Sequence, residues 1–184
     1  MRKDKIDKFE NVTRIAELNP TGTLIRAGLN ENMVLCDLGA GTGVFAFPAS
    51  GITHSTVHAL EISDEMIEIL EYRKKERAIE NIQIKKVISE VLPLDNDICD
   101  MVLMVTVLHE IRDPRLILAD IKRVLKKTGK LVIIEFHKKE TPMGPSIDHR
   151  LSIEYTEELC NSISLDATDK FDLGENFYCI IFEF

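Results

Sequence analysis

Three glycines at alternate positions follow an acidic residue in the stretch Asp37-x-Gly39-x-Gly41-x-Gly43. The apolar run over residues 33–36 predicts a strand that is buried on both faces. Glycine lets the chain turn sharply from strand to helix, and lets a ligand approach the main chain where a Cβ atom would collide. The helix after such a loop directs free N–H groups and the positive end of its dipole toward the ligand. The stretch therefore predicts a nucleotide-type ligand loop at the mouth of a parallel sheet.

The spacing of these glycines narrows the class of ligand. A dinucleotide-binding loop carries G-x-G-x-x-G, and its third glycine would fall at position 44, which is Val44. A phosphate-binding loop needs Gly-Lys followed by Ser or Thr, which the stretch lacks, and no basic residue lies between Met33 and Gly51. Asp37 instead suits a ligand with a cationic end, such as the ammonium group of an amino acid.

A second carboxylate ends the next predicted strand, Thr56–Glu61. Glu61 lies 18 residues beyond Gly43, where doubly wound folds place a carboxylate on ribose hydroxyls. Its two oxygens match two adjacent hydroxyl donors. The alternative is an acid without a ligand near the start of the next helix, but the glycine loop upstream favours ribose recognition.

Together these residues resemble the class I S-adenosylmethionine-dependent methyltransferases, whose first motif is D/E-x-G-x-G-x-G. The similarity covers residues 33–184. Residues 105–110 resemble the segment after strand four in small-molecule methyltransferases related to quinone-biosynthesis enzymes (methyltransferase type 11). Residues 136–150 resemble an uncharacterised subgroup. The resemblance implies S-adenosyl-L-methionine as cofactor, S-adenosyl-L-homocysteine as product and an unidentified, small-molecule methyl acceptor.

The same resemblance implies an α/β fold, a Rossmann-like three-layer sandwich around a seven-stranded, mostly parallel sheet. The expected strand order is 3-2-1-4-5-7-6, with strand seven antiparallel. We expect one domain over residues 1–184, with a helical N-terminal segment over residues 1–30. The expected cofactor contacts are Asp37, Gly39, Ala40, Gly41, Gly43, Glu61, Ile62, Met66, Glu90, Val91, Met104 and Val105.

The contacts expected at the adenine ring come from the segment after the third predicted strand, Ile82–Ile88, whose half-polar pattern is typical of a sheet edge. In the family an acid soon after this strand holds the adenine amino group, and an apolar neighbour covers the ring. Glu90 and Val91 match those places. The segment before Leu92-Pro93 is shorter than is usual in the family, so a surface role for Glu90 is the alternative.

Three histidines are candidates for the acceptor site. Methyl transfer from a sulfonium needs alignment and exclusion of water, and it needs a general base only where the acceptor loses a proton in the step. His109 follows the fourth predicted strand, His137 follows the fifth, and His149 lies in the irregular segment that comes next. Each is a candidate acceptor-pocket residue or base, with Glu110 as an orienting partner. The alternative for each is a structural histidine that moves no proton.

The irregular segment over residues 137–150 contains Pro142, Gly144 and Pro145, which fit a shaped but hinged loop. We expect this loop to recognise the acceptor and to close over it, with His109 and His149 lining the pocket.

The elements that carry these residues follow from helix and strand signals. Residues 1–10 are polar and predict at most a weak helix, and residues 13–29 predict a helix interrupted near Asn19. A helix follows the glycine loop, and Pro48 is expected to bend or end it. A further helix opens at Asp113-Pro114 and is expected to end at Thr128-Gly129, before a strand over residues 131–136.

The end of the chain predicts a β-hairpin, with strands over residues 168–173 and 178–184. A plain Rossmann domain would finish with another crossover helix, whereas a terminal hairpin that inserts an antiparallel strand is typical of class I methyltransferases. Because Ile180, Ile181 and Phe182 leave no polar face, we expect the last strand inside the sheet.

Composition limits the partners and the compartment. The 184 residues carry 31 acids and 23 bases, a net charge of −8, which disfavours a nucleic-acid partner. No apolar run reaches membrane-spanning length, so we expect a cytoplasmic protein without a membrane partner. The spacing of histidines and cysteines predicts no metal site, and His54 and His58 are expected to be structural. The four cysteines are expected to be buried, reduced thiols: Cys36, Cys99, Cys160 and Cys179.

Two other functions remain open at this point. A nicotinamide-dependent oxidoreductase is disfavoured by Val44 and by the terminal hairpin. A non-catalytic, S-adenosylmethionine-binding regulatory protein would keep the glycine loop and lack a working acceptor site. The sequence does not specify the acceptor atom or the oligomeric state.

Overall fold

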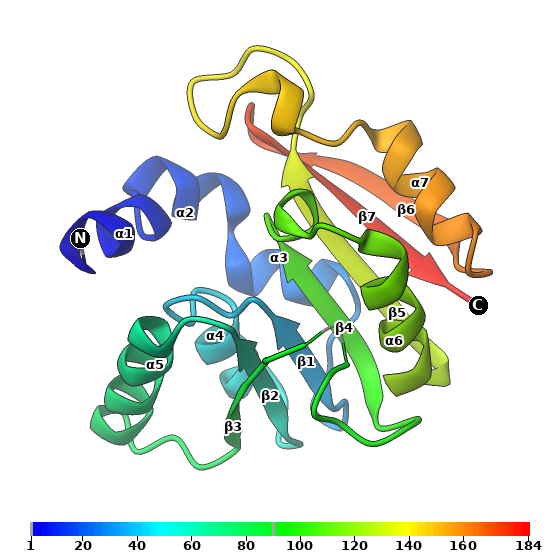
Figure 1. Ribbon diagram of the computed structural model, residues 1–184. Helices are drawn as coiled ribbons and strands as arrows, with labels where there is room; N and C mark the ends of the chain where they lie inside the picture. The colour runs from blue at the N-terminus through cyan, green and yellow to red at the C-terminus, as the bar shows by residue number, and fades with distance from the viewer. Residues whose placement is uncertain (1, 90) are drawn as a thin grey trace.

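A computed structural model describes residues 2–89 and 91–184 and contains one seven-stranded sheet. The strands are β1 (Leu35–Leu38), β2 (Val57–Glu61), β3 (Ile82–Lys86), β4 (Cys99–Val105), β5 (Leu125–Phe136), β6 (Asp166–Leu173) and β7 (Phe177–Glu183). The α-helices are α1 (Arg2–Phe9), α2 (Val12–Leu18), α3 (Pro20–Arg26), α4 (Ala46–Ile52), α5 (Asp64–Glu76), α6 (Pro114–Val124) and α7 (Ile153–Asn161), with short 3-10 turns η1 (Leu108–Glu110) and η2 (Ile147–His149). Figure 1 shows their arrangement.

The strand order is β3-β2-β1-β4-β5-β7-β6, as the sequence predicts. The first five strands pair in parallel, and β7 pairs antiparallel with both β5 and β6. The expected insertion of the last strand is confirmed, because Phe177 to Phe182 are all buried. The half-polar β3 lies at one edge of the sheet, as expected, and the mostly exposed β6 lies at the other.

Helices cover both faces of the sheet and make three layers. One apolar cluster joins β1, β2 and the central strands to side chains of α3, α4 and α5, and includes Leu24, Phe47 and Leu70. The second cluster joins the opposite face to α6 and α7, and includes Ile121 and Leu159. The four cysteines are buried free thiols within these layers. In the part of the chain that the structure describes, no helix has the length and apolar character to cross a membrane.

The N-terminal segment is helical from residue 2 onward, more strongly than its polar first ten residues predict. The interruption expected near Asn19 is confirmed: Asn19 has φ 39°, in the left-handed region, and separates α2 from α3. Pro20 follows as the first residue of α3, where its missing N–H is not needed.

The predicted effect of Pro48 is wrong. Pro48 is the third residue of α4, which runs on to Ile52. The first turn of a helix has no intrahelical partners for its N–H groups, so proline is tolerated there. The positive φ angles of the glycine loop delay the start of the helix to Ala46, and this delay places Pro48 in the first turn.

The predicted end of α6 at Thr128-Gly129 is also wrong, because the helix stops at Val124 and β5 begins at Leu125. The backbone N–H groups of Asp97 and Ile98 donate to the carbonyls of Arg123 and Val124, both at 3.0 Å. These contacts satisfy carbonyl groups that a longer helix would have used. The bonds come from a distant loop, so no local signal marks this end.

His58, in the middle of β2, is a buried polar side chain that the fold leaves unpaired. It is 3% exposed, and neither ring nitrogen has a hydrogen-bond partner. Burial and, to a lesser extent, the charge of Lys85 together lower the pKa of His58 to about 4. The folded protein therefore holds this ring neutral at pH values where an unfolded chain, with a pKa near 6.5, binds a proton.

We expect acid to destabilise the wild-type protein more than a His58→Leu variant. Since the unfolded state binds the extra proton, stability is lost as the pH falls from about 6.5 toward 4. From those two pKa values the additional loss between pH 7 and pH 4.5 is roughly 2 kcal/mol. Urea unfolding at both pH values measures it. If the wild type, His58→Leu and His58→Gln lose the same free energy of unfolding between the two pH values, His58 is already charged in the folded protein at pH 4.5.

Candidate functional site: a cavity at the glycine loop

The loop between β1 and α4 has positive φ angles at its three glycines: 77° at Gly39, 54° at Gly41 and 87° at Gly43. A Cβ atom at Gly39 would lie 2.4 Å from Val107, and one at Gly43 would lie 2.3 Å from Phe47. At Gly41 the nearest atoms would be 3.9 Å away. Gly39 and Gly43 are therefore required for packing, whereas Gly41 faces open space.

That space is a cavity of about 380 Å³ at the carboxyl ends of β1, β2 and β4. The strand order reverses between β1 and β4, which is where open α/β sheets bind ligands. In Figure 1 the helices α1 and α2 lie over this end of the sheet. The cavity is lined by Lys8, Phe9, Arg14, Asp37, Gly39, Ala40, Gly41, Thr42, Val44, Phe45, Glu61, Ile62, Ser63, Met66, Val105, Thr106, Val107 and Glu110.

Asp37 presents an unpaired carboxylate oxygen at this cavity. The residue is 2% exposed, and its Oδ2 atom has no hydrogen-bond partner. Burial and, to a lesser extent, the nearby charge of Glu61 raise the pKa of Asp37 to about 7, against a lowering by a backbone N–H at Ala46. A buried, unpaired carboxylate is costly. The site therefore favours a cationic or hydrogen-bond-donating group that reaches Asp37 from the cavity.

Glu61 binds the backbone of two loops through both of its oxygens. Oε2 accepts a hydrogen bond from the N–H of Gly41 at 2.8 Å. Oε1 accepts from the N–H groups of Ile62 at 2.8 Å and Ser63 at 2.9 Å. This carboxylate fixes the glycine loop against the turn after β2, and Oε2, which accepts a single bond, retains acceptor capacity for a ligand hydroxyl.

Arg14 is the buried cation of the site. It lies on α2, is 8% exposed, and donates to the Thr106 hydroxyl at 3.0 Å and to the Phe9 carbonyl at 3.2 Å. Burial lowers the pKa of Arg14 to about 10 and the charge of Glu135 opposes this, so the guanidinium stays protonated at neutral pH. Thr106 has φ 55°, a left-handed conformation that is unusual for a residue with a Cβ atom. The cavity is thus lined by both acidic and basic side chains.

The structure brings together most of the residues expected to contact a cofactor. Those that line the cavity are Asp37, Gly39, Ala40, Gly41, Glu61, Ile62, Met66 and Val105. Gly43 lies behind the loop against Phe47. Met104 is fully buried in the opposite apolar cluster, because alternate residues of a strand face opposite sides. Val91 is exposed and away from the cavity wall, and Glu90 lies outside the described residues.

The sequence reasoning did not identify which residues of the N-terminal helices line the cavity. Lys8, Phe9 and Arg14 line the cavity although no residue of this segment was singled out. A signal existed, because Arg14 lies four positions before Leu18 on the buried side of α2. A charged residue in an apolar stripe needs a partner. Glu110, expected only as an orienting partner of a histidine, also lines the cavity.

The three candidate histidines lie in different places, outside the cavity wall. His109 is hydrogen-bonded through Nδ1 to Glu135 at 2.7 Å. His137 lies 3.1 Å from Asp172, in a separate hollow near Tyr178. His149 contacts Ser146 at 3.3 Å. The structure therefore does not bring His109 and His149 together around one pocket.

The segment over residues 137–150 is held in place by Arg150. This buried guanidinium donates to the carbonyls of His137, Lys139, Met143 and Pro145 and to the hydroxyl of Thr141. The backbone N–H of Met143 also donates a hydrogen bond to Oδ1 of Asn176. So many bonds to one side chain oppose the hinge motion that its prolines and glycine suggest.

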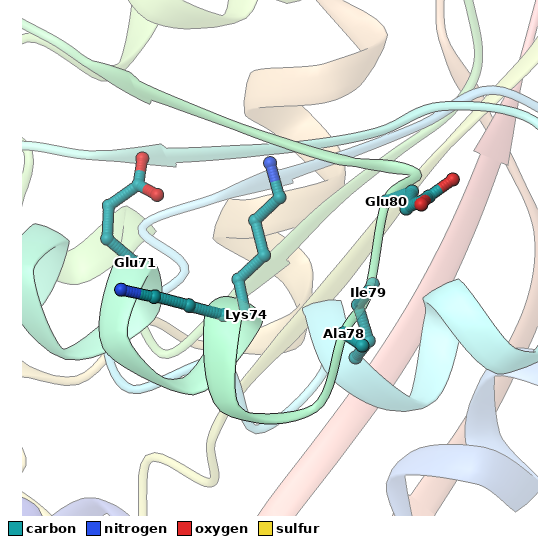
Figure 2. A pocket seen from close by; sticks show the side chains of 6 residues that line it. Glu71, Lys74, Ala78, Ile79 and Glu80 are labelled. Carbon is teal, nitrogen blue, oxygen red and sulfur yellow. The ribbon is translucent and has the colours of Figure 1, made fainter.

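Other hollows in the structure lack comparable chemistry. Figure 2 shows one of about 220 Å³ at the far end of α5, where Glu71, Lys74 and Glu80 project from its rim. These side chains carry both signs of charge at an open surface. Over the described residues, no group of three or more histidines, cysteines or acids is arranged to hold a metal ion.

Comparison with known proteins gives relatives for both the sequence and the fold. A family model described as a methyltransferase domain matches residues 29–176. The chain is 27% identical over 113 residues to the uncharacterised methyltransferase YcgJ of Bacillus subtilis, covering 61% of this chain and 44% of that relative. It is 26% identical over 157 residues to the ubiquinone/menaquinone biosynthesis C-methyltransferase UbiE of Shewanella halifaxensis, covering 84% of this chain and 62% of that relative. The chain thus spans less than two thirds of either relative.

The fold itself matches solved structures over nearly its whole length. A crystal structure of a SAM-dependent methyltransferase from Aquifex aeolicus superposes with a TM-score of 0.92 at 23% identity, covering 97% of this chain and 96% of that one. At this identity the likeness concerns the fold.

The glycine geometry predicts that substitutions at Gly41 and Gly43 differ in cost. Gly43→Ala combines a left-handed backbone with overlap onto Phe47 and Leu70, and should lower the free energy of unfolding by about 2–4 kcal/mol. Gly41→Ala carries only the backbone cost, about 1–2 kcal/mol. Chemical denaturation of both variants measures the difference. Equal losses of unfolding free energy would mean that Phe47 and Leu70 move aside for a Cβ atom at position 43.

Proposed function

Because the chain belongs to the methyltransferase-domain family, we propose that it binds S-adenosylmethionine in the glycine-loop cavity and methylates a small molecule. When bound, S-adenosylmethionine supplies a methyl group carried on a positively charged sulfur. The observation that carries the proposal is the unpaired, buried oxygen of Asp37 at the cavity wall. A ligand with an amino acid end offers that oxygen the cation it lacks.

The charges around the cavity support this orientation. Asp37 pairs with the ammonium group of the ligand, and Arg14 with its carboxylate, because the two side chains line one cavity and carry opposite charges. Opposite charges within a few ångströms stabilise each other strongly where water is excluded. Oε2 of Glu61 accepts a ribose hydroxyl with the acceptor site that the three backbone bonds leave. Gly41 leaves room beside the main chain.

The chain's own residues have a limited task in methyl transfer. They align the methyl group with the acceptor and exclude water from it, and the N-terminal helices supply the cover over the cavity. The relative named for ubiquinone and menaquinone biosynthesis is a C-methyltransferase, which makes an aromatic acceptor a reasonable first choice for testing. We keep the acceptor class at a small molecule because this chain spans only part of that relative.

Titration calorimetry with S-adenosylmethionine, S-adenosylhomocysteine and NAD tests the cofactor. We expect the first two to bind and NAD to give no heat. Binding of NAD alone would favour an oxidoreductase. A screen of small-molecule acceptors, read out as S-adenosylhomocysteine release, then distinguishes an enzyme from a non-catalytic binding protein.

Glu61→Ala should weaken S-adenosylmethionine binding by roughly 1.5–3 kcal/mol, the range for lost hydrogen bonds to a charged group. The substitution also removes three backbone bonds, so its melting temperature must be recorded with its affinity. Glu31→Ala, an exposed acid away from the cavity, is the matched control and should bind normally. Normal affinity for S-adenosylmethionine in a folded Glu61→Ala protein would show that Glu61 does not bind the ribose.

Affinity for S-adenosylmethionine should rise with pH through the pKa of Asp37. Because pairing with ammonium requires an ionised carboxylate and the free protein has a pKa of about 7 at Asp37, protonation competes with binding below that pH. Between pH 6.0 and 7.5 the affinity should rise roughly eightfold, and binding at pH 6 should release a proton. Asp37→Asn should abolish both effects, whereas Asp166→Asn on the exposed β6 should not. A pH-independent affinity in the wild type would exclude Asp37 as the ammonium partner.

A further inference from the structure

A buried carboxylate holds the ring of His109 at the carboxyl ends of β4 and β5. Glu135 is 1% exposed. Its Oε1 atom accepts the backbone N–H of His109 at 3.2 Å, and its Oε2 atom lies 2.7 Å from Nδ1 of the same residue. Both contacts of this carboxylate thus go to one histidine, and they fix the backbone and the ring together.

This contact determines which ring nitrogen is basic. A carboxylate can only accept, so Nδ1 must carry the hydrogen that joins it to Glu135. In the neutral ring the lone pair is then on Nε2. A carboxylate on Nδ1 also stabilises the positive ring that forms when Nε2 takes up a proton.

The surroundings of Nε2 connect it to the cavity. It lies 3.9 Å from Oε1 of Glu110, and Glu110 lines the cavity. Lys8, another cavity residue, acts electrostatically on the same ring. The ring also meets Phe136 edge to face, with centroids 6.1 Å apart. Nε2 is therefore the ring nitrogen near the side chain of Glu110, which lines the cavity.

Charged groups on several elements act on the pKa of the His109 ring, some raising it and some lowering it. Burial lowers the pKa of His109, but the hydrogen bond and charge of Glu135 and the charge of Glu110 outweigh it, against a lowering by Lys8, so the pKa lies above its ordinary value. On α2, Arg14 faces Glu135 and compensates part of its charge. On β7, Tyr178 is buried beside the same carboxylate, and burial together with Glu135 raises the pKa of its hydroxyl.

We propose that Glu135 is a positioning residue that holds His109 as a general base for acceptors whose reacting group carries an acidic proton, namely a phenolic hydroxyl or an activated carbon. This proposal rests on the methyl-transfer function and narrows its acceptor class. An amine acceptor attacks with its own lone pair and does not need a base placed in this way.

The step balances with the groups present. Nε2 of His109 takes the proton of the acceptor while the acceptor's oxygen or carbon bonds to the methyl carbon. The bond from that carbon to sulfur breaks, and its electron pair stays on the sulfur of S-adenosylhomocysteine. The imidazolium is stabilised by Glu135 and returns its proton to water at the rim.

The first test needs no turnover. Nitrogen NMR of ¹⁵N-histidine-labelled protein, with and without S-adenosylhomocysteine, reports the tautomer and pKa of His109. We expect the Nδ1–H tautomer in the wild type, and in Glu135→Gln a lower pKa with a mixture of tautomers. Glu135→Asp, which keeps the charge, should restore part of the shift. Glu110→Gln, which removes the exposed acid near Nε2, should change the pKa less than Glu135→Gln.

The second test uses three probes on the complex with S-adenosylhomocysteine: catechol, acetylacetone and benzylamine. Catechol or acetylacetone should move the Nε2 resonance, and benzylamine should not. With S-adenosylmethionine and a probe that the wild-type protein methylates, Glu135→Gln should lower turnover at least about tenfold. It should also move the acid limb of the pH profile of turnover to lower pH. The affinity for S-adenosylmethionine should stay within about threefold, because the interaction is made with the acceptor.

A hydrogen on Nε2 in the wild type, or an unchanged pKa of His109 in a folded Glu135→Gln protein, would overturn the role of Glu135. An Nε2 resonance that only benzylamine moves, or that none of the probes moves, would overturn the acceptor class. Failure of the methyl-transfer function itself would appear separately, as an absence of calorimetric binding of S-adenosylmethionine to the wild type.

Discussion

The carboxylate of Glu61 joins the two loops on which the cavity depends. Its hydrogen bonds to Gly41 on one side and to Ile62 and Ser63 on the other bind the turn after β1 to the turn after β2. Glycine conformations let the backbone N–H of Gly41 reach this carboxylate, since the loop has positive φ angles that other residues adopt at a cost. The N–H groups of Gly39 and Ala40 add two backbone bonds to the carbonyl of Leu60 at the end of β2, at 2.8 and 3.0 Å.

The site concentrates buried charge at one end of the sheet. Asp37, Glu61 and Arg14 line the cavity, and the pair of Glu135 with His109 lies outside its wall. Burying a charge is costly unless it is paired. Glu61, Arg14 and Glu135 all have hydrogen-bond partners, whereas Asp37 retains an oxygen without one. The fold therefore carries an unfavourable carboxylate, as expected where a ligand completes the pairing.

The N-terminal helices complete the cavity and tie it to the rest of the chain. Arg73 of α5 donates to the carbonyl of Thr42 at 2.9 Å and pairs with Glu10, which follows α1. Arg14 on α2 reaches Thr106 at the end of β4. The short helices α1 and α2 are held by these polar contacts at both sides of the ligand space. Their position makes the cover of the cavity part of the same hydrogen-bonded system as the glycine loop.

The sequence by itself determined the glycine loop and the carboxylates Asp37 and Glu61, because those features depend on local patterns: continuous apolar runs, glycine spacing and acids at strand ends. The order of the sheet followed from the resemblance to class I methyltransferases that these residues carry. Tertiary structure decided the rest. The end of α6 depends on hydrogen bonds from the backbone of Asp97 and Ile98. The side of the sheet that Met104 faces depends on how the alternating residues of β4 are placed relative to the cavity. The pairing of His109 with Glu135 joins residues that are 26 positions apart. Only the parallel packing of β4 beside β5 brings them within hydrogen-bond distance, and a contact of that kind leaves no local pattern in a single sequence.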